Sequence, residues 1–227
     1  TLAALWDVYT LAVDPASSEN VYAGTQGGFF RSTNGGGSWQ AADTGLTAVW
    51  TNIIVLNPLA PATLYAGTMG GMYKSTNSGR DWEPINTGLT NTNIESLAVD
   101  PQTPTTLYAG TWGGGVFKST NGGDSWSPCI TGLTNKNVEA LVINPAAPAT
   151  LYAGTPGGVF KSTDSCTNWA PSNTGLTTLW VSALAINPQS PGILYAATNG
   201  GGVFKTTNNG DNWIQTSTGL TSLTTRA

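Results

Sequence analysis

The octet Ser119-Thr120-Asn121-Gly122-Gly123-Asp124-Ser125-Trp126 recurs four more times in this sequence. The other copies occupy residues 32–39, 75–82, 162–169 and 206–213, so the five closing tryptophans stand 43, 44, 43 and 44 residues apart. A fixed period of this length is typical of repeat folds, and it indicates the fold more reliably than local sequence patterns do. The chain is therefore expected to consist of five similar units.

Each octet has the composition of a tight turn. Its first hydroxyl and its third side chain, Asn or Asp, can accept backbone N–H groups that a turn leaves unpaired. Glycine at the fifth position permits positive φ, and the closing Trp buries a large ring at the start of the next strand. The structural octet positions are Ser32, Asn34, Gly36, Trp39, Ser75, Asn77, Gly79, Trp82, Ser119, Asn121, Gly123, Trp126, Ser162, Asp164, Trp169, Thr206, Asn208, Gly210 and Trp213.

A calcium-binding loop is the alternative interpretation of the octet. Four of the five acidic slots hold Asn, and only Asp164 carries a charge. Calcium sites usually contain several carboxylates, so the structural turn is favoured and no metal site is predicted.

The segments between octets predict four short strands per repeat. Strand A is expected at residues 8–13, 53–56, 94–99, 138–143 and 181–186; strand B at 21–25, 64–68, 107–111, 151–155 and 194–198; strand C at 29–32, 72–75, 116–119, 159–162 and 203–206; and strand D from each octet Trp onward. Four short strands in about 43 residues are the signature of a propeller blade. The prediction is an all-β, five-bladed β-propeller with four antiparallel strands per blade and an octet in each C–D turn.

The whole chain is predicted to be one propeller domain. Its blades are expected at residues 1–44, 45–87, 88–131, 132–174 and 175–218, with a linker-like tail at 219–227. We expect the five blades to close into a ring, because an open array would expose apolar blade faces. The alternative is a piece of a longer array.

A resemblance to known proteins rests on these motifs. The octet resembles the Asp-box of BNR-repeat, sialidase-like propellers. The frame Leu107–Thr111 followed by Gly115–Thr120 resembles photosystem II assembly-factor-like and xyloglucanase-like repeats. The resemblance covers nearly the whole chain and implies a propeller. It implies no single function, because these families include hydrolases, receptors and assembly factors.

Composition restricts the classes of function. Charged residues make up 9% of the 227 residues, the net charge is −4, and basic residues are too few for nucleic-acid binding. No apolar run reaches the length of a membrane helix, so membrane insertion is not predicted. The absence of histidine excludes Ser-His-Asp and Cys-His catalysis, and no cofactor is predicted. The low charge favours an extracellular or periplasmic protein, although no signal peptide is visible.

Two cysteines interrupt the pattern. Cys166 replaces the octet glycine of the fourth repeat, and Cys129 lies three residues after Trp126 in the third. A disulfide between them and two separate buried thiols are both compatible with the sequence.

Two variable slots give the candidate ligand-binding residues. One is the B–C turn, which includes Trp112, and the other is the residue that enters strand A. Both slots lie on the same face of a propeller, where aromatic rings stack on sugars and amides bind hydroxyls. In a closed ring, tryptophans of blades five, one and two would form an arc, completed by two asparagines. The alternative is that these tryptophans are core residues. The candidates are Trp6, Trp50, Asn93, Trp112, Asn137 and Trp180.

Glu95 and Glu139 occupy the same strand-A slot in adjacent blades and are the only candidates for a catalytic carboxylate pair. The xyloglucanase resemblance implies acids in a cleft between two propellers, whereas only one propeller is present. The sialidase resemblance implies an arginine triad, whereas only Arg31, Arg80 and Arg226 exist and the first two belong to the repeat frame. The chain is therefore predicted not to be an enzyme.

The strand-C cations Arg31, Lys74, Lys118, Lys161 and Lys205 are expected to lie over their sheets with their heads in solvent. The sequence predicts a non-enzymatic binding or assembly scaffold with a glycan or protein partner. A structural subunit of an extracellular assembly or filament is the first alternative, and a fragment of a xyloglucanase-like hydrolase is the second.

Overall fold

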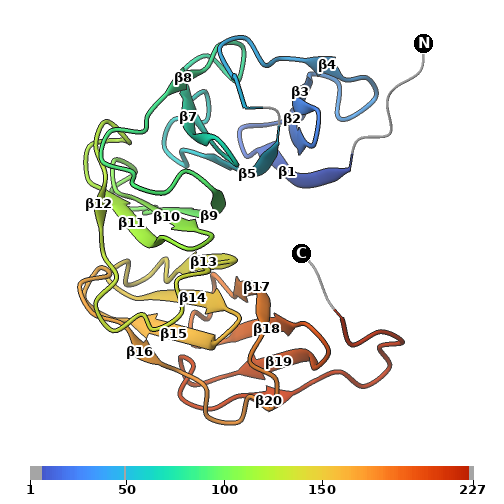
Figure 1. The fold of residues 1–227 in the computed structure, drawn as a ribbon. Coiled ribbons are helices and arrows are strands. Elements are labelled where there is room, and N and C mark those ends of the chain that lie inside the picture. Colours follow the sequence, from blue (N-terminus) through green and yellow to red (C-terminus); the bar gives the residue numbers. More distant parts are fainter. Residues whose placement is uncertain (1–6, 49, 225–227) are drawn as a thin grey trace. The chain divides into compact units, whose positions relative to one another are not determined.

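Five four-stranded antiparallel β-sheets form the regular structure of the computed structural model, which describes residues 7–48 and 50–224. No helix occurs in that part of the chain. In every sheet the strands are adjacent in sequence order, and we label them A to D. Figure 1 shows the chain completing each sheet before it enters the next. The predicted architecture of five propeller blades is confirmed.

The strands are short in every blade. The first blade contains β1 (Val8–Asp14), β2 (Ser17–Thr25), β3 (Gly28–Ser32) and β4 (Gln40–Ala41), and the second contains β5 (Thr51–Leu56), β6 (Leu64–Thr68), β7 (Gly71–Ser75) and β8 (Glu83–Pro84). The third contains β9 (Ile94–Val99), β10 (Leu107–Thr111), β11 (Gly115–Ser119) and β12 (Ser127–Pro128). The fourth contains β13 (Ala140–Ile143), β14 (Leu151–Thr155), β15 (Gly158–Ser162) and β16 (Ala170–Pro171), and the fifth contains β17 (Val181–Ile186), β18 (Leu194–Thr198), β19 (Gly202–Thr206) and β20 (Ile214–Gln215).

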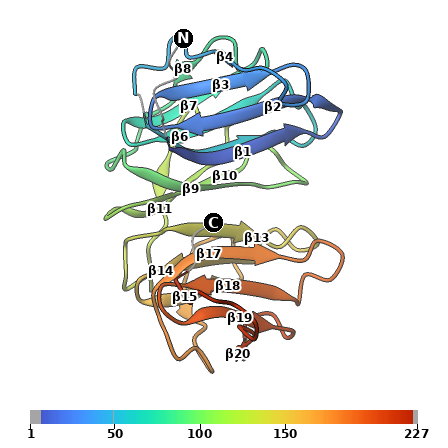
Figure 2. The ribbon, with the colours of Figure 1, turned by 90° about the vertical axis from the view of Figure 1, so that its right-hand side faces the viewer.

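The chain folds as two compact units. One consists of the residues up to Leu107 together with Ser119–Ser127, and the other consists of Tyr108–Lys118 together with the residues from Pro128 onward. Within the first unit the A strands β1, β5 and β9 contact one another in succession, and within the second unit β13 contacts β17. Figure 2 shows β17, β18, β19 and β20 side by side in that order.

Strand D begins one residue after the octet Trp, not at the Trp as the sequence predicted. In the second to fifth blades, the Trp backbone pairs outside its own sheet. The N–H of Trp82 donates to the carbonyl of Thr44 in the preceding blade at 2.9 Å, and the indole N–H donates to the carbonyl of Ala42 at 3.0 Å. The residue that seemed to start a strand therefore joins two blades.

The octets close through their own side chains. In the third blade the Ser119 hydroxyl accepts the Gly123 N–H at 3.0 Å and donates to Asn121 Oδ1 at 2.8 Å. That oxygen also accepts the N–H of Ser125 at 3.0 Å. These bonds pair backbone donors that a tight turn would otherwise leave exposed.

The hydrophobic core lies between consecutive blades. In the first unit, Trp82 packs edge-on against Phe29 of the preceding blade, with ring centroids 4.8 Å apart, and Tyr22 and Ile54 join the cluster. In the second unit, Trp213 belongs to a matching cluster with residues of the fourth and fifth blades. The octet Trp therefore packs in the contact between its own blade and the preceding one.

Two strand-C lysines bond to the next blade instead of ending in solvent, and that expectation was wrong for them. The amines of Lys74 and Lys118 donate to the carbonyls of Gly122 and Ser165, each at 3.2 Å, in the octet turn of the next blade. Lys161 pairs with Asp211 of the next octet at 3.3 Å. Each amine also lies within about 6 Å of the strand-B Tyr ring of its own blade, as at Lys118 and Tyr108, where the distance is 5.5 Å. The stem is thus held over the ring, where its head reaches the neighbouring turn.

Cys129 and Cys166 form a disulfide, with Cα atoms 5.7 Å apart. It joins the end of strand D in the third blade to the octet of the fourth. Cys166 has φ of +67°, keeps the octet bond from its N–H to the Ser162 hydroxyl, and is fully buried. A cysteine therefore replaces glycine in the same turn and adds a covalent bond between blades.

Reduction of this disulfide is expected to lower the free energy of unfolding by about 2–4 kcal/mol, because the bond closes a long loop in the unfolded chain. Urea unfolding with and without reductant measures the change. The double variant C129S/C166G, which restores the glycine of the other octets, is the control and should not respond to reductant. An equal response of both proteins would contradict the prediction.

Candidate functional site

B–C turns lie beside residues that enter strand A, within the second and fifth blades and between the third and the fourth. The N–H of Met69 in a B–C turn donates to the carbonyl of Trp50 at 3.3 Å, and the N–H of Asn199 donates to Trp180 at 2.9 Å. In the third and fourth blades, Trp112 forms a β-bridge with Asn137. The linkers that enter strand A and the B–C turns are therefore joined at one end of the blades, where a ligand would meet both.

Trp180 and Glu139 form a side-chain hydrogen bond at this end of the second unit. The indole N–H of Trp180 donates to Glu139 Oε1 at 2.8 Å, while the side chain of Trp180 stays 44% exposed. Glu139 directly precedes β13, and its own N–H donates to the Gly154 carbonyl at 3.0 Å. The backbone thus fixes the carboxylate-bearing residue, and the carboxylate orients an exposed indole.

Trp50 makes the corresponding contact in the first unit. Its ring centroid lies 6.1 Å from that of Tyr9, at an interplanar angle of 34°. Tyr9 sits at a β-bulge between Val8 and Thr10 in β1 and is exposed. The separation of 41 residues between Tyr9 and Trp50 equals that between Glu139 and Trp180. The residue that enters strand A therefore contacts the strand-A slot of the preceding blade in both units. In the first unit the contact is between two aromatic rings, and in the second it is a hydrogen bond from an indole to a carboxylate.

The remaining predicted residues differ in their exposure. Trp112 is exposed, whereas Asn93 and Asn137 are half-buried and their N–H groups donate to Asn91 and Asn135. The Oδ1 atom of Asn93 is buried and has no hydrogen-bond partner among the described residues. Trp6 lies outside the described residues. The arc that would join Trp180, Trp6 and Trp50 remains a prediction.

The two glutamates differ in their placement. Glu95 is the second residue of β9 in the first unit, and Glu139 lies in the second unit against Trp180. The contact between Glu139 and an aromatic ring escaped the sequence analysis, which weighed this residue only as an acid. The signal that could have found it is the repeated separation of 41 residues, which divides Tyr9 from Trp50 and Glu139 from Trp180.

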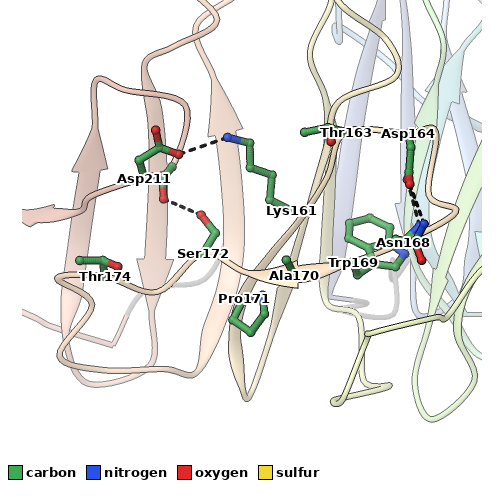
Figure 3. Close-up of a pocket in the computed structure, with 11 residues that line it drawn as sticks. Lys161, Thr163, Asp164, Asn168, Trp169, Ala170, Pro171, Ser172, Thr174 and Asp211 are labelled. Carbon is green, nitrogen blue, oxygen red and sulfur yellow. Dashed lines mark hydrogen bonds and ion pairs between the residues drawn. The ribbon is translucent and has the colours of Figure 1, made fainter.

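A recess of about 470 Å³ lies beside the fourth octet (Figure 3), and the residues that line it are not the predicted ligand-binding residues. Its charged groups are Lys161, Asp164 and Asp211, and the ion pair between Lys161 and Asp211 crosses it. Hydrogen bonds from Asn168 hold the pKa of the Asp164 carboxyl below its usual value. Burial raises the pKa of nearby Tyr152 to about 12, and Asp211 adds to this shift. The charged groups of this recess therefore already have partners in the protein: Asp164 bonds within its octet turn, and Lys161 pairs with Asp211 of the next blade.

The matching recess between the first two blades has a different charge. It measures about 340 Å³ and is lined by Arg31 and Arg80, with no carboxylate among its lining residues. The guanidinium of Arg31 donates to Asn20 at 3.2 Å. None of the predicted ligand-binding residues lines either recess.

No group of three or more His, Cys, Asp or Glu side chains in residues 7–48 and 50–224 is arranged to hold a metal ion. The same residues contain no helix that is long and apolar enough to span a membrane.

Comparisons with known proteins agree on the fold. The sequence matches no protein-family model and no curated protein. Among solved structures, it is similar to an ancestral GH74 enzyme, with a TM-score of 0.80 and 24% identity over 98% of this chain and 34% of that one. It is also similar to the GH74 xyloglucanase of Xanthomonas campestris, with a TM-score of 0.63 and 17% identity over 92% and 46%. YCF48 bound to D1 peptide matches with a TM-score of 0.66 and 18% identity over 95% and 69%.

These similarities establish that the chain has the β-propeller fold implied by its repeats. The chain spans between about a third and a half of the two GH74 structures. At identities below 25% the similarity concerns the fold alone, so function has to be argued from the site.

Proposed function

We propose that this propeller is a non-enzymatic binding module and that its sharpest ligand site is a glycan site at Trp180 and Glu139. The observation that supports the proposal is an indole ring that is 44% exposed and yet held by a hydrogen bond of 2.8 Å from its N–H to a carboxylate. An exposed ring is normally free to change rotamer, and ordering it on ligand binding costs free energy. Here the glutamate has already oriented the ring.

The chemistry of the pair matches a sugar. The apolar face of a pyranose stacks on an indole. Carboxylate and amide oxygens accept hydrogen bonds from the hydroxyl groups of the sugar. Asn199 lies beside Trp180 through its backbone bond, so an amide stands at the same end of the blade. The name of one similar structure, a xyloglucanase, adds a polysaccharide as the first ligand class to try.

Trp180→Ala is expected to weaken glycan binding roughly tenfold or more, equivalent to about 1.4 kcal/mol, because the stacking surface is removed. Glu139→Gln should weaken it less, because the amide oxygen can still accept the indole N–H. A glycan array identifies a ligand, and titration calorimetry then measures both variants.

Trp39→Ala is the matched control, since Trp39 is 40% exposed but belongs to an octet. It should bind the glycan as the unchanged protein does. Equal losses in W39A and W180A, or no binding to any glycan, would contradict the glycan site.

The second candidate is a protein-binding scaffold or a subunit of an extracellular assembly. It is favoured by the aromatic pair formed by the exposed Tyr9 and the half-buried Trp50, and by the similarity to YCF48, whose structure contains a bound peptide. The disulfide supports an oxidising, extracellular or periplasmic location. Under this proposal the glycan array is blank and Trp50→Ala weakens binding to the protein partner.

A hydrolase fragment is the third candidate, favoured by the similarity to GH74 enzymes and by Glu139 at the proposed site. Release of reducing ends from xyloglucan, abolished in E139Q, would replace the non-enzymatic proposal by this one.

A further inference from the structure

The sixth octet position brings a carboxylate to the preceding blade in two of the interfaces. Between the fourth and fifth blades it is Asp211, which pairs with Lys161 at 3.3 Å. The third blade has Asp124 at the same position. Burial raises the pKa of Tyr65 in the second blade, and Asp124 adds to this shift. The Lys74 amine lies 6.0 Å from the centre of that Tyr ring, so a negative group accompanies the strand-C cation there as well.

The interface between the first and second blades reverses this charge. The sixth octet position of the second blade is Arg80, and the strand-C cation of the first blade is Arg31. Both residues line the recess of about 340 Å³, and none of its lining residues is a carboxylate. Two guanidiniums that line one recess repel each other, and an anion bound between them removes this repulsion.

Arg31 is held differently from the lysines of the later blades. Lys74 and Lys118 each donate to a carbonyl of the next octet at 3.2 Å. The Arg31 Nη2 group donates instead to Asn20 of its own blade at 3.2 Å, and the Asn20 amide donates to Asp14, also at 3.2 Å. The later blades have Thr or Ile at the position of Asn20. A side chain that the other repeats lack therefore orients the Arg31 head.

The recess keeps donors that the protein does not use. A guanidinium has five N–H donors, and the Arg31 Nε–H is buried without a hydrogen-bond partner among residues 7–48 and 50–224. The Ser38 hydroxyl accepts a bond from Asn34 at 2.9 Å, so its own O–H can donate to a ligand. The other polar residues that line the recess are Thr33, Gln40 and Thr44.

We propose that the recess between the first and second blades binds an oxyanionic group, either a free inorganic oxyanion or a sulfate or phosphate ester on a sugar. Guanidiniums form charge-assisted and bidentate hydrogen bonds with such groups. The recess of about 340 Å³ is roughly ten times the ~30 Å³ of one water molecule, which leaves room for part of an attached group.

The anion site is complete within one unit of the chain. All its lining residues belong to the first unit, whereas Trp180 and Glu139 belong to the second. The two blades that form it are adjacent in sequence, and the bonds from Trp82 to Thr44 and Ala42 join them. The proposal is therefore independent of the glycan site.

Proton–nitrogen NMR spectra of the arginine Nε–H groups test the proposal. The sequence has three arginines, so R31K and R80K assign the two signals of the recess. Sodium sulfate replaces sodium chloride at constant ionic strength, which leaves general screening unchanged. We expect both signals to shift and to saturate with a dissociation constant on the order of 1 mM. Absence of a shift, or a shift that never saturates, would overturn the proposal.

Arg80→Asp is the decisive variant, because it restores the acid found at Asp211. We expect it to fold, to pair with Arg31 and to weaken sulfate binding at least tenfold, measured at the Arg31 signal. Lys136→Asp is the control, since it changes the net charge equally at an exposed residue of the second unit. It should bind sulfate as the unchanged protein does. Retained binding in R80D, or an equal loss in K136D, would contradict the site.

Glucose sulfate and unmodified glucose distinguish the two sources of the oxyanion. An affinity for the ester at least tenfold above that for inorganic sulfate assigns the site to an anionic glycan. An affinity that is no higher assigns it to the free oxyanion. Glucose alone should leave both arginine signals unchanged, and shifts with glucose as large as those with the ester would refute an oxyanion site.

Discussion

Gly132→Ala is expected to destabilise the protein by roughly 4 kcal/mol or more, an effect in the range of the most disruptive single substitutions. The new Cβ would fall on the backbone carbonyl of Trp169 in the next blade, and backbone atoms cannot rotate away as a side chain can. The interface would have to separate, which also breaks the bond from the Trp169 N–H to Thr131 at 2.8 Å. Urea unfolding monitored by circular dichroism measures the loss.

Gly219→Ala provides the matched control in dilute solution. Gly219 has nearly the same backbone conformation as Gly132, but no described atom lies near its Cβ position. Only the strain of a left-handed alanine remains, about 1–2 kcal/mol. The difference between the two variants therefore isolates the inter-blade contact. Equal destabilisation would show that backbone strain, not contact with the next blade, selects glycine at this position.

Trp82→Ala is expected to lower the free energy of unfolding by about 3–5 kcal/mol. Its indole is 3% exposed, packs on Phe29 and donates to the carbonyl of Ala42, so truncation leaves a large cavity and an unpaired buried acceptor. Trp82→Phe should recover part of the loss, because it restores ring packing but not the hydrogen bond.

The control is Trp39→Ala, which makes the same replacement at the same octet position. Because Trp39 is largely outside the core, we expect a loss of about 1 kcal/mol or less in a dilute, unassociated sample. Thermal unfolding by calorimetry distinguishes the two variants. A large effect of W39A under these conditions would mean that the octet Trp stabilises its own blade more than the interface.

Periodicity made the fold predictable, because every blade repeats the same turn and strand pattern. The octets and the order of the four strands in each sheet follow from local chemistry that the sequence displays directly. The closed ring and the single domain remain predictions, as do the roles of Trp50 and Trp180 in binding.

Contacts between blades were less predictable. The contact of Trp180 with Glu139, and the reach of Lys74 and Lys118 to the next octet, depend on how far one blade is offset from its neighbour. A sequence gives the position of a residue within its repeat but not that offset. The error about strand D at Trp82 has the same origin, since a strand-like residue formed its bonds with another blade.

The disulfide between Cys129 and Cys166 has a mechanical consequence. The two cysteines are 37 residues apart in the chain. If the protein were stretched from its two ends until every blade unravelled, this segment would not extend while the bond was intact. At about 3.3–3.6 Å per residue, the bond withholds roughly 120–130 Å of contour length. A chain under force would therefore gain this length only after the disulfide is reduced. The redox state of the bond between the third and fourth blades thus sets how far the chain can extend.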